Sequence, residues 1–402
     1  MTPPKVAHVT TTDMSLRYLL LNQLRSLEQS GYDVVGISSA GPDVPALEAA
    51  GIRHIPVEMT RSALTPFRDL IAITQLYRLF RRERFAIVHA HNPKPGLLAQ
   101  VAARLARVPV IVNTVHGFYF HDAMRPMLRR FHIGLEKVAA RCSDVILSQN
   151  LEDIEVAVRE GIAGRAKMKH LGNGIDLSQF DPASIPPPER ASLKRDLHWP
   201  ESALVVGYVG RLAARRKGFL DFLAAAREVA AVFSDVYFLV VGAEDKGKPD
   251  SVSPDVVDAS GISNRFHFTG WLPNSELPRL YAAMDLLVLP SLFEGIPRTL
   301  MEAAAMGLPV VATDVKGNRE VVENEVTGLL VPYADPASLA AAISRLVSDP
   351  PLRRRFGENA LASAASRFDE RVVFDMIRRE YDRLLSEKNL NIASLDVPRE
   401  GS

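Results

Sequence analysis

The sequence "LLVLPSLFEGIPRTLMEAAAMGLPVVAT", from Leu286 to Thr313, is the part of the chain that says most about its fold. It begins with a short apolar run at Leu286–Leu289, continues with a longer helical pattern, and ends with a second apolar run at Pro309–Thr313. Short runs in which nearly every residue is apolar are typical of strands buried on both faces of a parallel sheet. The stretch therefore predicts a strand, helix and strand in succession, as in an α/β fold.

Short β-branched runs alternate with helical patterns along the whole chain, which is typical of parallel sheets flanked by helices. The segment "PASIPPPER", Pro182–Arg190, interrupts the alternation with four prolines and is interpreted as a linker. The remaining expected strands are Val6–Thr10, Val34–Ser38, Ile87–Ala90, Val108–Thr114, Val145–Ser148 and Met168–Leu171 before it, and Leu204–Val209, Val236–Val241, Arg265–Phe268 and Gly328–Val331 after it.

The chain has 402 residues, which exceeds one ordinary core. We expect two doubly wound, Rossmann-like α/β domains that face a cleft. The first covers residues 1–183 and the second residues 184–369. A C-terminal helix follows at residues 370–388, because Glu370–Glu387 has apolar residues at helical spacing.

The composition of the chain excludes some classes of protein and indicates a cellular compartment. Cys142 is the only cysteine, which excludes an internal disulfide and a cysteine-rich metal site and fits a reducing compartment. No apolar stretch reaches the roughly 18 residues needed to span a bilayer, and the N-terminus enters a strand pattern without a signal peptide. Residues 1–185 hold 22 Lys+Arg against 17 Asp+Glu, a net charge of +5. We expect a cytoplasmic protein, peripheral at the inner face of the membrane if it engages one.

Two cations follow the predicted strand that ends at "YVGRL". Gly210 is at the turn, and Arg211 and Lys217 come after it. Such a pair can neutralise a diphosphate, Arg through a bidentate fork and Lys as a point charge. A solvated basic helix start is the alternative, which the neighbouring Arg215 and Arg216 make equally reasonable.

Two carboxylates lie eight positions apart within Leu286–Thr313. Glu294 follows a strand and precedes Gly295, where the backbone can approach a ligand closely, and Glu302 lies about two turns into the next helix. A carboxylate suits a ribose or hexose diol because it accepts hydrogen bonds from two hydroxyls. The alternative is a capping Glu294 and a surface Glu302, but the flanking apolar runs and Gly295 favour a sugar-binding role.

These motifs closely resemble those of retaining glycosyltransferases of family four, which have the GT-B fold. The resemblance covers nearly the whole chain, is strongest over residues 204–332, and is closest to bacterial polysaccharide and lipid-linked oligosaccharide glycosyltransferases. It depends on four elements in the right order: the spacing of Arg211 and Lys217, the spacing of Glu294 and Glu302, "NGID" at Asn173–Asp176, and "VVATDVKGNREVVENEVTGLLVP" at Val310–Pro332.

The resemblance implies a donor site for a nucleotide-diphosphate sugar, most simply UDP-linked. Arg211 and Lys217 would hold the diphosphate, with Gly210 at the turn before them. Glu302 would hold the ribose and Glu294 the hydroxyls of the donor sugar. The backbone of Gly295, Ile296 and Pro297 would lie against the sugar and phosphate.

The resemblance also implies a histidine from the N-terminal domain beside the donor sugar, and a final helix that crosses back to that domain. "TVHGF" supplies His116 after a strand, although a buried and satisfied histidine is the alternative. The motif "HAHNPKP", with His89 and His91, is interpreted as a structural or acceptor-side loop. No acid or cysteine partner at a metal-ligand spacing accompanies it.

The expected mechanism needs no metal cofactor. The chain has no Asp-x-Asp, so Arg211 and Lys217 would stabilise the leaving diphosphate. No carboxylate nucleophile is evident, which favours a front-face displacement with retention, in which the leaving diphosphate helps to deprotonate the incoming hydroxyl. Many relatives have a glycine-rich loop after the first strand, whereas this chain has Thr11, Thr12 and Asp13. Thr12, Asp13 and Asn173 are the candidates for the acceptor side.

The acceptor is expected to be a glycan or a lipid-linked molecule. The segment Met124–Arg141 places Met127, Phe131, Leu135 and Val138 on one helical stripe among basic residues, a surface that can bind anionic lipid headgroups. A core helix with a solvated face is the alternative. No nucleic-acid partner is expected.

Other classes of protein remain at this point. An epimerase acting on UDP-sugars or a phosphorylase could share the GT-B fold, although a phosphorylase would need a lysine for pyridoxal phosphate in a much longer chain. A non-catalytic nucleotide-binding partner is disfavoured because both cations and both carboxylates are present. A nicotinamide dehydrogenase is disfavoured because no G-x-G-x-x-G follows any strand.

Overall fold

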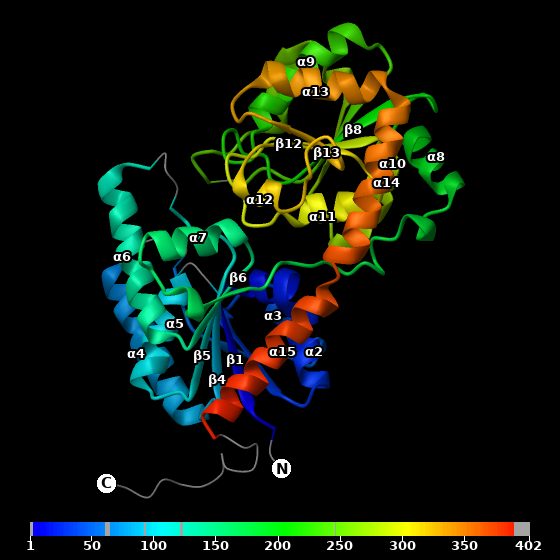
Figure 1. Cartoon of the computed structure of the whole chain (residues 1–402). Coiled ribbons are helices and arrows are strands. Elements are labelled where there is room, and N and C mark those ends of the chain that lie inside the picture. The colour runs from blue at the N-terminus through cyan, green and yellow to red at the C-terminus, as the bar shows by residue number, and fades with distance from the viewer. Residues whose placement is uncertain (1–2, 61–64, 92–93, 121–123, 246, 390–402) are drawn as a thin grey trace, which may run out of the picture. The chain divides into compact units, whose positions relative to one another are not determined.

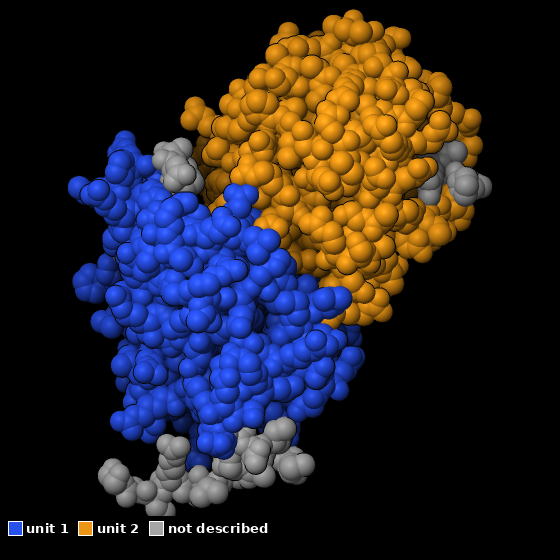
Figure 2. All heavy atoms as spheres, in the orientation of Figure 1, with its two compact units in different colours: residues 1–172, 372–402 blue, residues 173–371 orange. Residues whose placement is uncertain are grey.

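The computed structural model describes residues 3–60, 65–91, 94–120, 124–245 and 247–389, and it divides into two compact units (Figures 1 and 2). Unit 1 comprises residues 1–172 and 372–402, and unit 2 comprises residues 173–371. The division falls between Gly172 and Asn173, earlier in the chain than residue 183.

Unit 1 contains one parallel sheet with the strand order β3-β2-β1-β4-β5-β6-β7. Strand β3 was not predicted, because it lies at the sheet edge with partly exposed side chains and so lacks a continuous apolar run. The strands are β1 (Lys5–Thr12), β2 (Asp33–Ser39), β3 (Arg53–Pro56), β4 (Ile87–His91), β5 (Val110–Val115), β6 (Val145–Ser148) and β7 (Met168–His170).

Helices cover both faces of this sheet (Figure 1). The first face carries α4 (Pro66–Glu83) and α5 (Lys94–Leu105), with α6 (Pro126–Cys142) packed beside α5. The opposite face carries α2 (Leu21–Gln29) and α15 (Glu370–Glu387), whose Ile377 and Tyr381 are buried in the core. The remaining helices are α1 (Asp13–Ser15), a π-helical turn at Leu16–Leu20, α3 (Val44–Ala49), α7 (Leu151–Arg159) and a 3-10 turn at Arg165–Lys167.

Unit 2 contains a second parallel sheet with the order β10-β9-β8-β11-β12-β13. Helices α9 (Phe219–Val232) and α13 (Pro336–Ser348) pack on one face, and α10 (Leu277–Ala283) and α11 (Arg298–Ala305) pack on the other. Helix α14 (Pro350–Arg367) contributes buried residues to the cores on both faces. The strands are β8 (Leu204–Val209), β9 (Val236–Val241), β10 (Phe266–Gly270), β11 (Leu286–Leu289), β12 (Val310–Thr313) and β13 (Gly328–Val331). Unit 2 also contains α8 (Pro187–Asp196) and α12 (Lys316–Arg319), with 3-10 turns at Pro182–Ser184, Pro254–Ser260, Ser263–Arg265 and Asn274–Glu276.

The linker predicted at Pro182–Arg190 is wrong as a description of local structure. Pro182–Ser184 forms a 3-10 turn and α8 begins at Pro187. Proline is favoured in the first turn of a helix, where the missing N–H has no partner to lose. The proline cluster therefore starts a helix here.

Each sheet has a switch point, where the strand order reverses: between β1 and β4 in unit 1, and between β8 and β11 in unit 2. In open α/β sheets, ligands bind beyond the carboxyl ends of the strands at such points. A ligand is therefore expected beside the segments that follow β1 and β4 in unit 1 and those that follow β8 and β11 in unit 2.

Candidate active site

The segment after β8 is held in one conformation by its own unit. The hydroxyl of the buried Tyr208 donates to the carbonyl of Arg211 at 3.0 Å, and the Asp250 carboxylate accepts the backbone N–H groups of Arg215 and Arg216 at 3.0 and 2.8 Å. Because the backbone is fixed at several points, the segment presents its cations from defined positions beside the switch point.

Lys217 and Glu294 form an ion pair at this switch point. The Nζ of Lys217 lies 2.6 Å from Oε1 of Glu294, and the two side chains are only 16% and 13% exposed. Lys217 follows β8 and Glu294 follows β11, so the pair joins the two strands between which the order reverses. The pair brings together one cation and one carboxylate that the sequence placed at the site.

Arg211 has a different carboxylate partner. Its Nη1 lies 2.5 Å from Oδ2 of Asp245, in the segment after β9, and its side chain is 47% exposed. Gly210 and Gly242 lie close together here, because a Cβ on Gly242 would lie 2.0 Å from the carbonyl oxygen of Gly210. The guanidinium is therefore accessible at the same strand edge, with its charge partly balanced by Asp245.

Glu302 is buried in the second turn of α11. Its Oε2 accepts a hydrogen bond from the hydroxyl of the buried Tyr281 at 2.9 Å, and Nε of Arg298 lies 3.7 Å from its Oε1. Burial raises the pKa of Glu302, while Arg298 and Tyr281 oppose that shift. The carboxylate is thus oriented by two neighbours.

The turn between Glu294 and α11 is packed against two further segments. A Cβ on Gly317 in α12 would lie 2.3 Å from the carbonyl oxygen of Gly295 and 2.6 Å from that of Glu294. The side-chain amide of Asn173 donates to the carbonyl of Ile296 at 3.3 Å. Asn173 therefore braces this turn within unit 2. Pro297 is buried and caps the start of α11.

His116 lies in unit 1, directly after β5. Its Nε2 is 3.0 Å from Nδ1 of His91, and a hydrogen bond with the side chain of Gln149 opposes the effect of burial, which lowers the pKa of His116 to about 4. At neutral pH the ring is therefore uncharged. It can donate one hydrogen bond and accept another.

Thr11, Thr12 and Asp13, which replace the glycine-rich loop of many relatives, lie at the junction between a strand and a helix. β1 extends to Thr12, and α1 begins at Asp13. The Thr12 hydroxyl lies 3.3 Å from that of Ser15, and the buried Asp13 carboxylate accepts the backbone N–H groups of Met14 and Asp43 at 2.9 and 2.8 Å. Asp13 thus stabilises the segment after β2.

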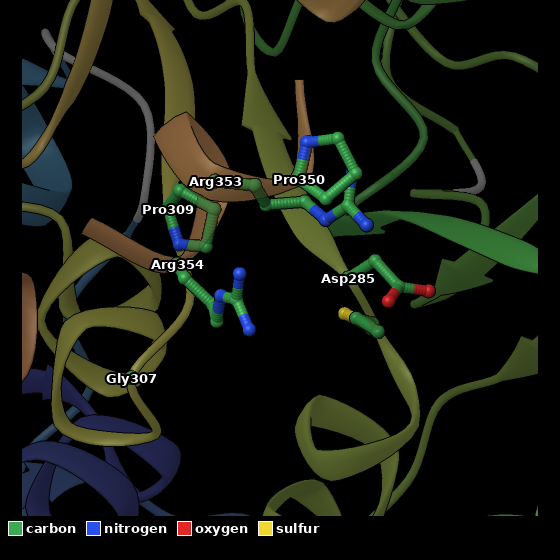
Figure 3. Close-up of a pocket in the computed structure, with 7 residues that line it drawn as sticks. Asp285, Gly307, Pro309, Pro350, Arg353 and Arg354 are labelled. Atoms are coloured by element: carbon green, nitrogen blue, oxygen red, sulfur yellow. The ribbon is translucent and has the colours of Figure 1, made fainter. Parts of the chain in front are cut away.

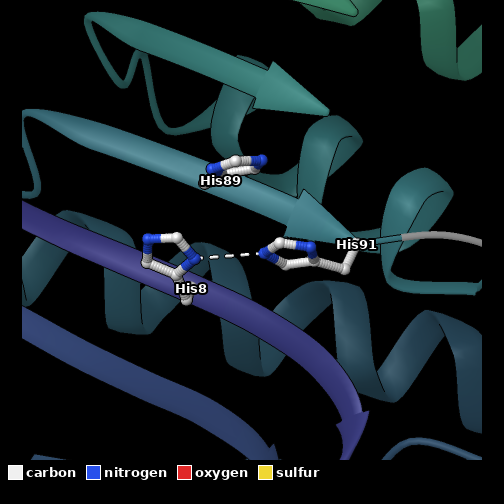
Figure 4. Close-up of side chains that lie close together, drawn as sticks. All are labelled: His8, His89 and His91. Atoms are coloured by element: carbon white, nitrogen blue, oxygen red, sulfur yellow. Dashed lines mark hydrogen bonds between the residues drawn. The ribbon is translucent and has the colours of Figure 1, made fainter. Parts of the chain in front are cut away.

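Among the described residues, His8, His89 and His91 lie close enough together to be considered as metal ligands (Figure 4). Their possible ligand atoms lie within 4.8 Å of one another. However, the rings of His89 and His91 are nearly parallel, with centroids 4.5 Å apart and an interplanar angle of 18°. The lone pairs of a ring lie in its plane, so those of two parallel rings do not converge on one ion. This geometry does not fit a metal centre.

A separate hollow of about 470 Å³ lies in unit 2 (Figure 3). Asp285 and Pro309, which precede β11 and β12, line it together with Arg353 and Arg354 of α14. It is therefore at the amino ends of the strands, opposite the edge that carries Lys217 and Glu294. Asp285 accepts the N–H of Val205 at 2.8 Å, so its carboxylate has a structural role.

Several residues of the site were not found from sequence. Tyr281 and Tyr208 look like ordinary core aromatics in the sequence, and Asp245 lies in a segment without a motif. Gly317 was not predicted either, although a glycine inside "VATDVKGNRE" is a signal of close backbone approach that could have identified it.

Comparison with known proteins agrees with this architecture. Residues 203–349 match the family model "Glycosyl transferases group 1", and residues 5–150 match "Glycosyl transferase 4-like". The UDP-Gal:alpha-D-GlcNAc-diphosphoundecaprenol alpha-1,3-galactosyltransferase of Escherichia coli is 30% identical, over 86% of this chain and 88% of that protein. The capsular polysaccharide biosynthesis glycosyltransferase CapM of Staphylococcus aureus is 25% identical, over 95% and 98%.

Solved structures share the fold. The crystal structure of Anabaena Alr3699/HepE in complex with UDP has a TM-score of 0.78 and 21% identity, and the match covers 94% of this chain and 100% of that one. The two α/β units, each with one parallel sheet, therefore have the GT-B fold of such structures. The chain belongs to the group 1 glycosyltransferases, family four, which confirms the resemblance found in its motifs.

Proposed function

We propose that the protein is a retaining glycosyltransferase that moves a hexosyl or N-acetylhexosaminyl group from a UDP-sugar to a hydroxyl of a lipid-linked or glycan acceptor. The observation that supports the proposal most is the ion pair between Lys217 and Glu294 at the switch point, because an ammonium group suits a diphosphate and a carboxylate beside it suits sugar hydroxyls. The choice of UDP is supported by the donor in the name of the Escherichia coli relative and by the UDP complex of Alr3699/HepE.

Each residue has a role in this proposal. Lys217 and Arg211 neutralise the diphosphate and stabilise it as the leaving group, while Glu302 binds the ribose diol and Glu294 the donor sugar. The turn Gly295–Pro297, held by Gly317, lets the backbone approach the donor, and Gly210 permits the same after β8. His116 is assigned to the donor sugar, the role that the family resemblance implies.

A transfer assay tests the proposal. UDP-glucose, UDP-galactose and their N-acetylhexosamine counterparts are offered with a polyprenyl-diphosphate-linked hexosamine, with and without EDTA. We expect transfer with one of these donors, an α-anomeric product by proton NMR, and equal rates in both buffers. A β-anomeric product would contradict retention, and loss of activity in EDTA would contradict the metal-free mechanism.

We further propose that the acceptor is lipid-linked and that the protein acts as a peripheral protein at an anionic, cytoplasmic membrane surface. The E. coli relative acts on a diphosphoundecaprenol-linked sugar. The apolar stripe of α6 is not part of the core: Met127 is 85% exposed, Val138 46% and Phe131 41%, and Arg125 and Arg130 lie beside them. None of the described helices is long and apolar enough to cross a bilayer.

A second group of exposed apolar side chains in unit 1 supports the proposed membrane-binding surface. At the start of α4, Phe67 is 87%, Leu70 63% and Ile71 57% exposed. Helices α4 and α6 each follow one strand and precede another of the same parallel sheet, with α5 between them. Their first turns therefore both lie at the carboxyl edge of that sheet.

Replacing two residues of the α6 stripe tests this surface. We expect the double variant Met127→Ser, Phe131→Ser to bind vesicles of phosphatidylglycerol at least roughly tenfold more weakly than wild type, because each buried side chain contributes about 1.5 to 3 kcal/mol. The matched control is Val232→Ser, which removes a 73% exposed side chain from α9 in unit 2 and should bind like wild type. Equal sedimentation of all three proteins with the vesicles would contradict the proposal.

A further inference from the structure

Four histidines, a tyrosine and a threonine of unit 1 form one continuous chain of hydrogen-bonding groups. Nε2 of His116 is 3.0 Å from Nδ1 of His91, and Nε2 of His91 is 3.0 Å from Nδ1 of His8. The Tyr381 hydroxyl lies 3.3 Å from Nε2 of His8 and 2.5 Å from Nδ1 of His89, whose Nε2 is 2.7 Å from Oγ1 of Thr114.

The fold creates this chain by bringing distant segments together. His8 of β1 and His89 of β4 are register partners across the switch point, and His91 ends β4 beside the end of β5. Tyr381 belongs to α15, near the C-terminal end of the sequence, and its hydroxyl joins the hydrogen-bonded groups of β1 and β4. Figure 4 shows His8 and His91 pointing toward each other from adjacent strands.

The rings are neutral and arranged edge to edge. His8, His89 and His91 are buried, which lowers their pKa values, that of His8 to about 3. The planes of His8 and His91 differ by 23°, and those of His91 and His116 by 29°, with both pairs of centroids 5.3 Å apart. Rings at these angles and distances can direct an N–H of one toward the lone pair of the next.

Counting protons restricts the chain to two complete arrangements. A neutral imidazole has one N–H and one acceptor nitrogen, and a hydroxyl donates once. If His91 donates to His116 through Nδ1, then His8 must donate to His91 through Nδ1, Tyr381 to His8, and His89 to Tyr381 through Nδ1. In the reverse arrangement every ring carries its proton on Nε2. Among His116, His91 and His8, any mixture leaves two donors or two acceptors facing each other in the buried interior. If His89 alone has the other tautomer, the Tyr381 hydroxyl either has no acceptor left in the chain or faces a second acceptor nitrogen, which is also unfavourable.

We propose that His8, His91 and Tyr381 are positioning residues that fix the tautomer of His116 through this chain, so that all four histidines share one tautomer. The tautomer decides whether Nδ1 of His116 donates or accepts. The Gln149 amide can complement either state, because it offers both an oxygen and an NH₂ group. The effect of this tautomer on catalysis rests on the proposed function, in which His116 contacts the donor sugar. The coupling of the four tautomers does not depend on the proposed function.

Nitrogen-15 NMR of the histidine-labelled full-length protein tests the chain directly. Couplings between ring nitrogens and carbon-bound protons identify the tautomer of each ring, and single His→Gln variants assign the signals. We expect His8, His89, His91 and His116 to show the same tautomer, or the same population of two. A different tautomer at any one of the four would overturn the proposal.

Removal of one hydroxyl then tests the coupling over distance. Tyr381→Phe keeps the buried ring but breaks the link between His8 and His89, so we expect the tautomer population of His116 to change as well. The matched control is Tyr32→Phe, since Tyr32 packs on Tyr381 with centroids 5.8 Å apart but donates to Asp382 at 2.5 Å, outside the chain. A His116 signal that is unchanged in Tyr381→Phe, or altered equally in both variants, would overturn the coupling.

Kinetics separate this inference from the proposed function. With the donor that supports transfer, we expect Tyr381→Phe to lower kcat roughly tenfold with little change in KM, as is typical when a group that orients a site residue is lost, and Tyr32→Phe to leave both unchanged. An unaltered kcat in Tyr381→Phe would overturn the positioning role. If no donor supports transfer, the proposed function fails while the NMR result still decides the chain.

Discussion

Lys217→Ala will lower kcat/KM for sugar transfer by about 10²- to 10³-fold or more, the range typical for loss of one preorganised group that stabilises developing charge. Lys217 is the cation paired with Glu294 at the switch point of unit 2, and its side chain is only 16% exposed. In a partly buried site, water does not efficiently replace the positive charge that the variant lacks. Steady-state transfer kinetics measure the effect.

The control for this variant is Arg215→Ala. Arg215 is an exposed cation in the same segment, and its backbone N–H rather than its side chain bonds to Asp250. We expect wild-type kinetics for Arg215→Ala and thermal stabilisation by UDP comparable to wild type. Lys217→Ala should lose most of that stabilisation. Turnover within a few-fold of wild type in Lys217→Ala would refute the assignment.

Gly317→Ala should reduce transfer at least about a hundredfold and lower the unfolding temperature. The added methyl group would lie 2.3 Å from the carbonyl oxygen of Gly295, a contact that only a shift of the backbone can relieve. That shift displaces the turn carrying Glu294, and overpacking of this kind costs about 1 to 3 kcal/mol. Calorimetry and transfer assays measure the two effects.

The comparison for Gly317→Ala is Gly164→Ala. Gly164 is exposed, has φ −70°, and has no atom within 4 Å of its added Cβ. This variant should match wild type in stability and transfer. A Gly317→Ala protein with normal stability and normal transfer would show that the turn does not depend on this close approach.

The fold was predictable because local signals agree with it. The run from Leu286 to Thr313 contains β11, α11 and β12 as expected, and Glu370–Glu387 was predicted with the bounds that α15 has in the structure. Parallel strands buried on both faces give continuous apolar runs, and those runs are visible without any knowledge of neighbours. Strand β3 was missed because its edge position removes that signal.

The contacts within the site were not predictable in the same way. The spacing of Glu294 and Glu302 marked both carboxylates, but their partners, Lys217 and Tyr281, are set by which strands and helices become neighbours. His8 and His89 lie in separate strands that could be matched only once the order β1-β4 was known. Similarly, the stripe on α6 has the periodicity of a core helix, and only its exposure distinguishes the two alternatives.

The return of α15 to the first sheet affects how the polypeptide can be made and divided. Residues 173–371 are contiguous and complete their own core, whereas the core of unit 1 includes Ile377, Tyr381 and Leu384 from the end of the chain. On the ribosome, the half that is synthesised first must therefore wait for the last helix before it can finish folding, and the half synthesised second can finish before it. A fragment truncated after residue 172 would expose the apolar core residues that this helix covers, so a recombinant version of unit 1 needs α15 joined to it.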